Sequence, residues 1–145
     1  MATSATSSFG TFLKIGDGAT PIEGFTTIAE VRDISGPSLA LDTEEVTSHD
    51  SPGGWEEFVA TILRSGEVSF DLNFLPTNAT QSYAAGLIAD MVAKTKRNFQ
   101  LIFTNVGATT WAFAAYVTAF EPSAPVAGAL TASASLKITG QPTLA

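Results

Sequence analysis

The chain has 145 residues, enough for one domain that buries its own core, and 45% of them are hydrophobic against 14% charged. It has no cysteine, which excludes disulfides and thiolate sites, and its formal net charge of -7 argues against gripping nucleic acid through phosphate neutralisation. The polar first residues and the lack of any apolar run near the roughly 18 residues of a membrane span predict a soluble chain without an export signal or membrane binding.

Turn residues separate short stretches with the alternating, aromatic-rich pattern of β-strands. Residues 1–10, rich in Ser, Thr and Ala, precede the first stretch and predict a flexible N-terminal arm. The expected strands are 12–15, 25–34, 38–46, 67–75, 98–104, 111–120 and 130–139. This series is typical of an antiparallel β-sandwich or barrel, mainly β, in a single domain over residues 11–145.

One flanking α-helix is predicted over residues 79–94, because Tyr83, Leu87 and Met91 fall along a single apolar stripe. The only basic cluster of the chain, Lys94, Lys96 and Arg97, follows at the end of this helix. Cations at that position interact favourably with the helix dipole, which is one explanation for the cluster. A contact with the acidic region of another subunit is the other.

The longest predicted loop, residues 47–65, lies between two amphipathic strands and carries exposed apolar side chains. A hairpin usually needs only two to five or so residues, so a loop of this length is functional or disordered. It contains His49, Asp50, Trp55, Glu56, Glu57 and Phe58. Such side chains are typical of an interface, which favours a role in assembly.

No catalytic constellation emerges. His49 and Asp50 stand beside two serines, but adjacent residues in a Gly/Pro loop do not give the line of nucleophile, base and orienting group. The acids Asp42, Glu44, Glu45, Glu56 and Glu57 are the residue types of a calcium site, yet their spacing matches no EF-hand loop. Solvated acids are the better interpretation, and we expect neither a metal nor a cofactor.

Several segments follow one another in an order that resembles the major tail tube proteins of long, non-contractile-tailed bacteriophages. They are Glu30-Val31-Arg32-Asp33-Ile34-Ser35-Gly36-Pro37, Thr47-Ser48-His49-Asp50, Gly53-Gly54-Trp55-Glu56-Glu57-Phe58, Arg64-Ser65-Gly66-Glu67-Val68 and Phe70-Asp71-Leu72-Asn73-Phe74. The resemblance runs from about Thr11 to Thr139 and implies a structural virion protein, not an enzyme. Contractile-tail tubes and the type VI secretion tube share the implied fold.

The resemblance further implies hexameric rings that stack into a hollow tube, with sheets of neighbouring subunits joined into one inner barrel. It places Asp42, Glu44, Glu67 and Asp71 toward an acidic lumen that repels DNA, so that the genome passes without specific binding. The loop 47–65 would reach the next ring. The implied partners are the chain itself, the tape measure protein and the tail tip and tail terminator proteins, in a virion tail assembled in the host cytoplasm.

Two other functions remain open at this point. A monomeric or decorating β-sandwich would bind carbohydrate or protein through exposed aromatic residues such as Trp55. A type VI secretion tube ring would share the architecture. Particle size separates the first from a tube protein, because a binding module stays small whereas a tube subunit polymerises.

Overall fold

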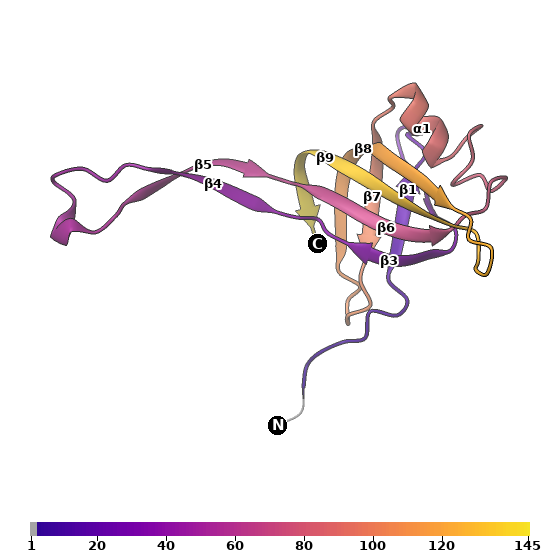
Figure 1. Cartoon of the computed structure of the whole chain (residues 1–145), viewed down its shortest axis with the longest axis horizontal. Helices are drawn as coiled ribbons and strands as arrows, with labels where there is room; N and C mark the ends of the chain where they lie inside the picture. The colour runs from indigo at the N-terminus through magenta and orange to yellow at the C-terminus, as the bar shows by residue number, and fades with distance from the viewer. Residues whose placement is uncertain (1–2) are drawn as a thin grey trace.

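The computed structural model describes residues 3–145, which form nine β-strands, one α-helix and one short 3-10 turn (Figure 1). Met1 and Ala2, the start of the predicted N-terminal arm, lie outside the described residues. The strands are β1 (Phe12–Gly16), β2 (Phe25–Thr27), β3 (Val31–Ser35), β4 (Ala40–Glu45), β5 (Phe58–Arg64), β6 (Glu67–Asn73), β7 (Arg97–Ile102), β8 (Thr110–Ser123) and β9 (Thr131–Leu144). The helix is α1 (Leu87–Ala93), and the 3-10 turn is η1 (Pro52–Gly54).

Seven strands form one antiparallel sheet in the order β2-β1-β7-β8-β9-β6-β3. Its edge strands, β2 and β3, share no ladder within residues 3–145, so the sheet does not close into a barrel. The prediction of a mainly β, antiparallel fold with one helix is therefore confirmed, and the sheet of the single chain is open.

The core lies on one face of this sheet because its strands alternate between apolar and polar residues. Strand β6 is the clearest case: Val68, Phe70 and Leu72 are buried, and the residues between them are exposed. Helix α1 packs against β8 and buries Leu87.

The second sheet contains only β4 and β5, which form a hairpin that projects from the body (Figure 1). We call β4, β5 and the turn between them, residues 40–64, the arm. Gly36 and Gly66 join it to β3 and β6 with φ angles of 104° and 73°, a region that favours glycine. A Cβ at Gly36 would collide with the backbone of Glu67, and one at Gly66 with Ser38. The arm thus prolongs the β3–β6 pair beyond the main sheet.

The predicted loop over residues 47–65 is wrong in its second half, which is the strand β5 (Phe58–Arg64). Its sequence, FVATILR, does not alternate between apolar and polar residues. Neither side of the strand is buried, since all seven residues are exposed. The hydrogen-bonding partner, β4, defines the strand, and no sequence period marks it.

The predicted helix over residues 79–94 is also too long, because α1 begins only at Leu87. The preceding segment is held by buried side chains instead: Gln81 donates hydrogen bonds to the Ala29 and Asn73 carbonyls and accepts one from the Leu75 N–H. These bonds compete with helical ones.

The same contacts divide the predicted strand 25–34 into β2 and β3. At the break, Ala29 donates its N–H to Thr80 Oγ1, and Glu30 adopts a φ of 50°.

Among the described residues, no helix is long and apolar enough to span a membrane.

Candidate assembly surfaces

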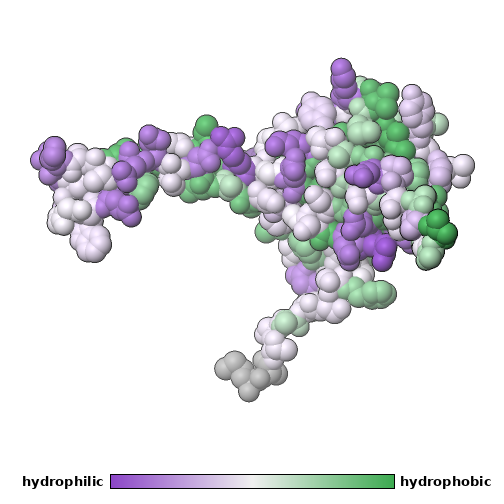
Figure 2. Space-filling view, viewed as in Figure 1, coloured by the Kyte–Doolittle hydropathy of each residue, from purple (hydrophilic) through white to green (hydrophobic). Residues whose placement is uncertain are grey.

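Within the part of the chain that the structure describes, the apolar side chains of the arm are left exposed. Leu41 and Leu63 are 52% and 80% exposed and lie directly opposite each other in the β4–β5 register; Leu39, just before the arm, is 57% exposed. Hydrophobic and hydrophilic side chains both lie along its surface in Figure 2. An isolated two-stranded hairpin is marginally stable in water, and exposed apolar patches of this kind are typical of interaction surfaces.

The tip of the arm is nevertheless ordered by its own hydrogen bonds. Ser51 is buried, accepts the Ser48 N–H at 2.9 Å and donates its hydroxyl to Glu57 Oε2 at 2.8 Å. Glu57 in turn donates its N–H to Thr47 Oγ1 at 2.9 Å. We call Thr47, Ser48, Ser51 and Glu57 the tip clasp.

The tip clasp presents Trp55, which is 77% exposed although it follows an ordered turn. Its backbone N–H donates a hydrogen bond to the Pro52 carbonyl, and its ring lies next to Gly53, whose φ is 65°. Phe58, at the start of β5, is 53% exposed. The structure therefore holds two aromatic side chains in the solvent at the free end of the arm, as the sequence led us to expect.

The predicted lumen residues lie in two different places. Asp42 and Glu44 are on the arm, where Asp42 Oδ2 accepts a hydrogen bond from Arg64 Nε at 2.8 Å. Glu67 and Asp71 are on the exposed face of β6 in the main sheet. Strand β4 pairs with β5 and not with β6, so the two predicted lumen segments are not neighbours in one sheet.

The exposed side of β6 and β9, together with the adjoining side of β8, is a largely polar surface, which we call the polar face. Asp71 accepts a hydrogen bond from Ser133 at 2.8 Å, and Glu67 lies opposite Lys137 in the β6–β9 register. Tyr116 is opposite Lys137 on the other side. Our sequence analysis missed two charged residues of this face: Lys137, whose place the strict alternation of β9 signals, and Glu121 of β8, which lies opposite Ser133.

The predicted basic cluster has divided roles. Arg97 Nη2 lies 3.1 Å from Asp90 Oδ1, and its Nη1 donates to the Gly16 carbonyl at 3.1 Å. Burial raises the pKa of the Asp90 carboxyl above its ordinary value, and Arg97 opposes this shift. Lys94, in the left-handed conformation after α1, and Lys96 are exposed.

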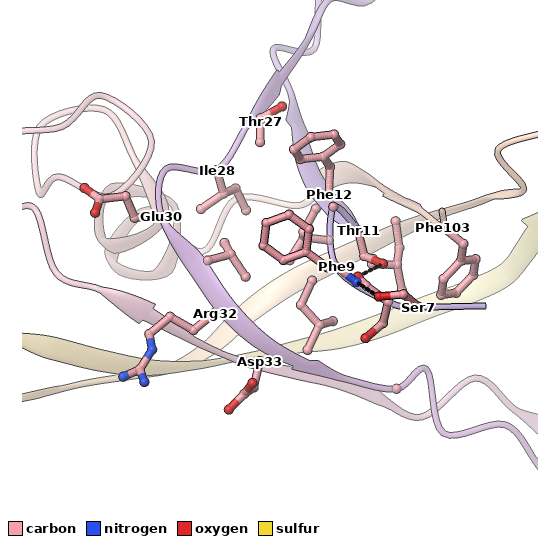
Figure 3. A pocket seen from close by; sticks show the side chains of 17 residues that line it. Ser7, Phe9, Thr11, Phe12, Thr27, Ile28, Glu30, Arg32, Asp33 and Phe103 are labelled. Atoms are coloured by element: carbon pink, nitrogen blue, oxygen red, sulfur yellow. Dashed lines mark hydrogen bonds between the residues drawn. The ribbon is translucent and has the colours of Figure 1, made fainter. Parts of the chain in front are cut away.

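A groove of about 810 Å³ lies between the two edges of the main sheet, with β1 and the end of β2 on one side and β3 on the other. Figure 3 shows Phe9, Phe12 and Phe103 on one side, while Arg32 and Asp33 extend away from them. The start of β1 and the edge strand β3 line it, together with residues 7–10 of the N-terminal segment. The groove lies where the edges of the open sheet fail to pair, and its lining contains no histidine or cysteine.

The tip residues His49 and Asp50 are not arranged for catalysis. The Ser51 hydroxyl is directed to Glu57, and Ser48 Oγ accepts the Asp50 N–H at 3.3 Å. Within residues 3–145, no three His, Cys, Asp or Glu side chains come together in a way that would hold a metal ion. The surfaces that stand out chemically are the arm, the polar face and the basic end of α1.

Several solved structures share this fold. A chain in the tail of an empty gene transfer agent particle aligns with a TM-score of 0.77 and 20% identity over 97% of this chain and 99% of that one. The virion of the native particle gives a TM-score of 0.76 at 18% identity, with the same coverage. The SPP1 tail tube gives 0.62 at 16% identity, over 92% of this chain and 75% of that one.

No curated protein is similar enough in sequence to count as a relative. Residues 16–145, nearly the whole chain, match the family model described as the lambda phage tail tube protein, TTP. The order of motifs from Glu30 to Phe74 had indicated the same assignment. The protein therefore belongs to the lambda phage tail tube protein family and is a structural component of a virion tail.

Proposed function

We propose that this chain forms hexameric rings that stack into the hollow tail tube through which the phage genome passes. The observation that carries this proposal is the exposed apolar arm, which prolongs two strands of the main sheet beyond the body of a tail tube family member. The C6 symmetry described for the gene transfer agent tail supports six copies in a ring.

Two free strand edges support ring closure. Strand β7 pairs only with residues 110–115 of β8, so residues 116–123 have a free edge on that side among the described strands. At the other end, β3 pairs with β6 alone. Between these edges the strands run β8-β9-β6-β3, an even number of antiparallel strands.

The even number of strands fixes the direction in which the edges of neighbouring copies meet in a ring. When copies are related by rotation about a ring axis, β3 of one copy meets β8 of the next in the antiparallel sense. Joining these edges gives each free backbone group a partner and removes exposed strand edges, which are otherwise sites of aggregation. The open sheet of the single chain thus becomes part of a closed wall in the ring.

The polar face would line the lumen of this wall, because the opposite face is occupied by the core. Glu67 and Asp71 lie on it, together with Ser133 and Lys137. The carboxylates repel DNA phosphates, and the serine hydroxyls offer no fixed charge that would hold a strand. DNA therefore passes along the surface without specific binding.

The arm would connect rings. It leaves the sheet along the direction of β3 and β6, and Asp42 and Glu44 would travel with it to a neighbouring ring. Trp55 and Phe58 would anchor the tip there, as buried aromatic residues commonly do in interfaces. The exposed Lys94 and Lys96 offer a complementary charge to the acidic arm at subunit contacts.

The remaining partners follow from membership of the family. A tube of defined length encloses a tape measure protein and ends at tail tip and tail terminator proteins, and these contacts would complete the tail in the host cytoplasm. No membrane contact of this chain is part of the proposal.

Negative-stain electron microscopy across a concentration series tests the proposal. We expect rings and hollow tubes with a stain-filled bore, and six-fold symmetry in end-on views. Addition of a tail tip complex should lower the concentration at which tubes appear if nucleation limits assembly. Small dispersed particles at all concentrations, with the tip complex present, would contradict the proposal and favour a monomeric binding module.

A further inference from the structure

An exposed uncharged turn lies at the opposite end of the body from the arm. It connects β8 to β9 through residues 124–130, Ala-Pro-Val-Ala-Gly-Ala-Leu. Val126 is fully exposed and Leu130 is 41% exposed. Figure 2 shows hydrophobic side chains at this end of the molecule, where β8 turns into β9 in Figure 1.

The turn has a fixed shape. Ser123 and Thr131 pair across its base as the last residues of the β8–β9 ladder. A Cβ at Gly128 would lie 2.8 Å from the Pro125 ring, so the two sides of the turn are packed against each other. A short rigid loop with an exposed valine loses little conformational entropy when it binds. We call residues 124–130 the knob.

A groove of about 580 Å³ lies at the base of the arm. Its apolar walls are Leu39, Leu41 and Leu63, all more than half exposed, and Pro142 near the end of β9 closes it. Ser65 donates its hydroxyl to the Gly140 carbonyl at 2.9 Å and fixes the arm against β9. The remaining lining residues are Ala40, Arg64, Ser65, Gly140 and Gln141.

The electrostatics of the groove also suit the knob. Its one cation, Arg64, is paired with Asp42 at 2.8 Å, so the groove offers no unpaired charge among its described lining residues. The knob contains no charged residue. An apolar, uncharged loop can therefore enter without leaving a desolvated charge behind, which would cost far more than the contact gains.

The knob and the groove are at the two ends of one strand. The knob leads into the first residue of β9, Thr131, and the groove includes Gly140 and Pro142 near its other end. At about 3.3 Å per residue, a shift on the order of 40 Å along β9 places the knob of one copy on the groove of another in the same orientation. Complementary patches at different sites give a head-to-tail contact that repeats without closing.

We propose that the knob of one subunit seats in the groove of a subunit in the adjacent ring, with Val126 against Leu41 and Leu63. The inference rests on the proposed function, because it names the stacking contact of the tube. It also explains why the groove lies at the base of the arm: with the knob seated there, the arm extends along the body of the neighbouring copy and carries Trp55 to it.

A disulfide test uses the absence of native cysteine. Tubes of the double variant Leu63→Cys, Val126→Cys are assembled under reducing conditions, verified by electron microscopy and then oxidised. We expect a ladder of covalent oligomers on a non-reducing gel, since a disulfide forms only between Cα atoms within about 7 Å. The matched control is Leu63→Cys with Val106→Cys, because Val106 is an equally exposed valine in the β7–β8 turn; it should give no ladder.

A charge test measures the same contact without cysteine. Val126→Asp should raise the concentration at which tubes appear by about tenfold or more and leave single rings visible, whereas Val106→Asp should match wild type. Adding Leu63→Lys to Val126→Asp should restore part of the loss. Wild-type tubes combined with no ladder and unchanged assembly of Val126→Asp would overturn the knob contact alone. A wild-type chain that forms neither rings nor tubes would contradict the proposed function, and the knob contact with it.

Discussion

Glu67 lies directly opposite Lys137 in the β6–β9 ladder, on the exposed face of the main sheet. Our sequence analysis assigned Glu67 and Asp71 to an acidic lumen, yet these carboxylates have polar or charged neighbours: Lys137 lies opposite Glu67, and Ser133 is bonded to Asp71. Opposite charges across a strand pair contribute roughly 0.2–1 kcal/mol to the sheet. In the proposed ring, a lumen lined by this face would repel phosphate weakly, and its charge can be changed in either direction by substitution.

Charge reversal on the polar face should create DNA binding. Tubes of Glu67→Lys with Asp71→Lys present cations in place of the acids, so we expect DNA to co-sediment with them at low salt and to be released as salt rises. Lys137→Gln changes the charge in the opposite direction and should leave co-sedimentation at the wild-type level. Equal DNA retention by wild-type and reversed tubes would show that this face is outside the lumen.

Removing the aromatic anchors of the arm should block assembly and spare the fold. Trp55→Ala with Phe58→Ala deletes two exposed side chains, so the thermal midpoint of the subunit should change little, whereas tube formation should weaken by about 2 kcal/mol or more. Sedimentation of assembled protein measures this loss. Tyr83→Ala provides the control, because Tyr83 is 69% exposed on another part of the body. Tubes that form normally without both anchors would remove the tip from the ring contact.

Loosening the tip clasp should mobilise the tip in the free subunit. Ser51→Ala removes the hydroxyl that joins Ser48 to Glu57, a loss of about 1 kcal/mol per bond, and we expect faster amide hydrogen exchange over residues 47–57. Thr61→Ala is the matched control, since it deletes an arm hydroxyl whose bond, to the Asp42 carbonyl, lies outside the tip. Unchanged exchange in Ser51→Ala would show that the turn η1 orders the tip without the tip clasp.

The buried Asp90 should give the stability of the subunit a pH dependence of known sign. Burial raises the pKa of Asp90 in the folded chain above the ordinary value of 3.8. The contribution of Asp90 to the free energy of unfolding is therefore fully present below pH 3.8, and it is lost as pH rises through the raised pKa. Asp90→Asn stays neutral throughout. Its free energy of unfolding relative to wild type should therefore increase between about pH 4 and neutral pH, measured by urea denaturation at each pH.

A second variant at the same site separates charge from hydrogen bonding. Asp90→Ala leaves Arg97 without its carboxylate acceptor and should lower the free energy of unfolding by about 1–3 kcal/mol. Since Arg97 also bonds the Gly16 carbonyl, β1 should lose protection from hydrogen exchange together with α1. A relative stability of Asp90→Asn that falls with pH would contradict the assigned direction of the shift.

Much of the main sheet was predictable because alternation survives where one face is buried. In β6, Val68, Phe70 and Leu72 alternate with polar residues, and the sequence alone indicates both the strand and the face that carries Glu67 and Asp71. The family was accessible on a different ground, the resemblance of the motif order from Glu30 to Phe74 to that of tail tube proteins. The exposed aromatics Trp55 and Phe58 also follow from an apolar loop that no local core could absorb.

Elements without such a period depended on partners distant in the sequence. Strand β5 has no buried side, and its pairing with β4 defines it as a strand. Residues 79–86 are not helical because the side chain of Gln81 donates a hydrogen bond to the carbonyl of Ala29, 52 residues away. The sequence by itself determined the strand-rich domain, its tail tube family and the apolar character of the arm. Only the tertiary structure decided that Asp42 and Glu67 belong to separate sheets and that Lys137 lies opposite Glu67, because hydrogen-bonded register between remote strands leaves no local pattern in either strand.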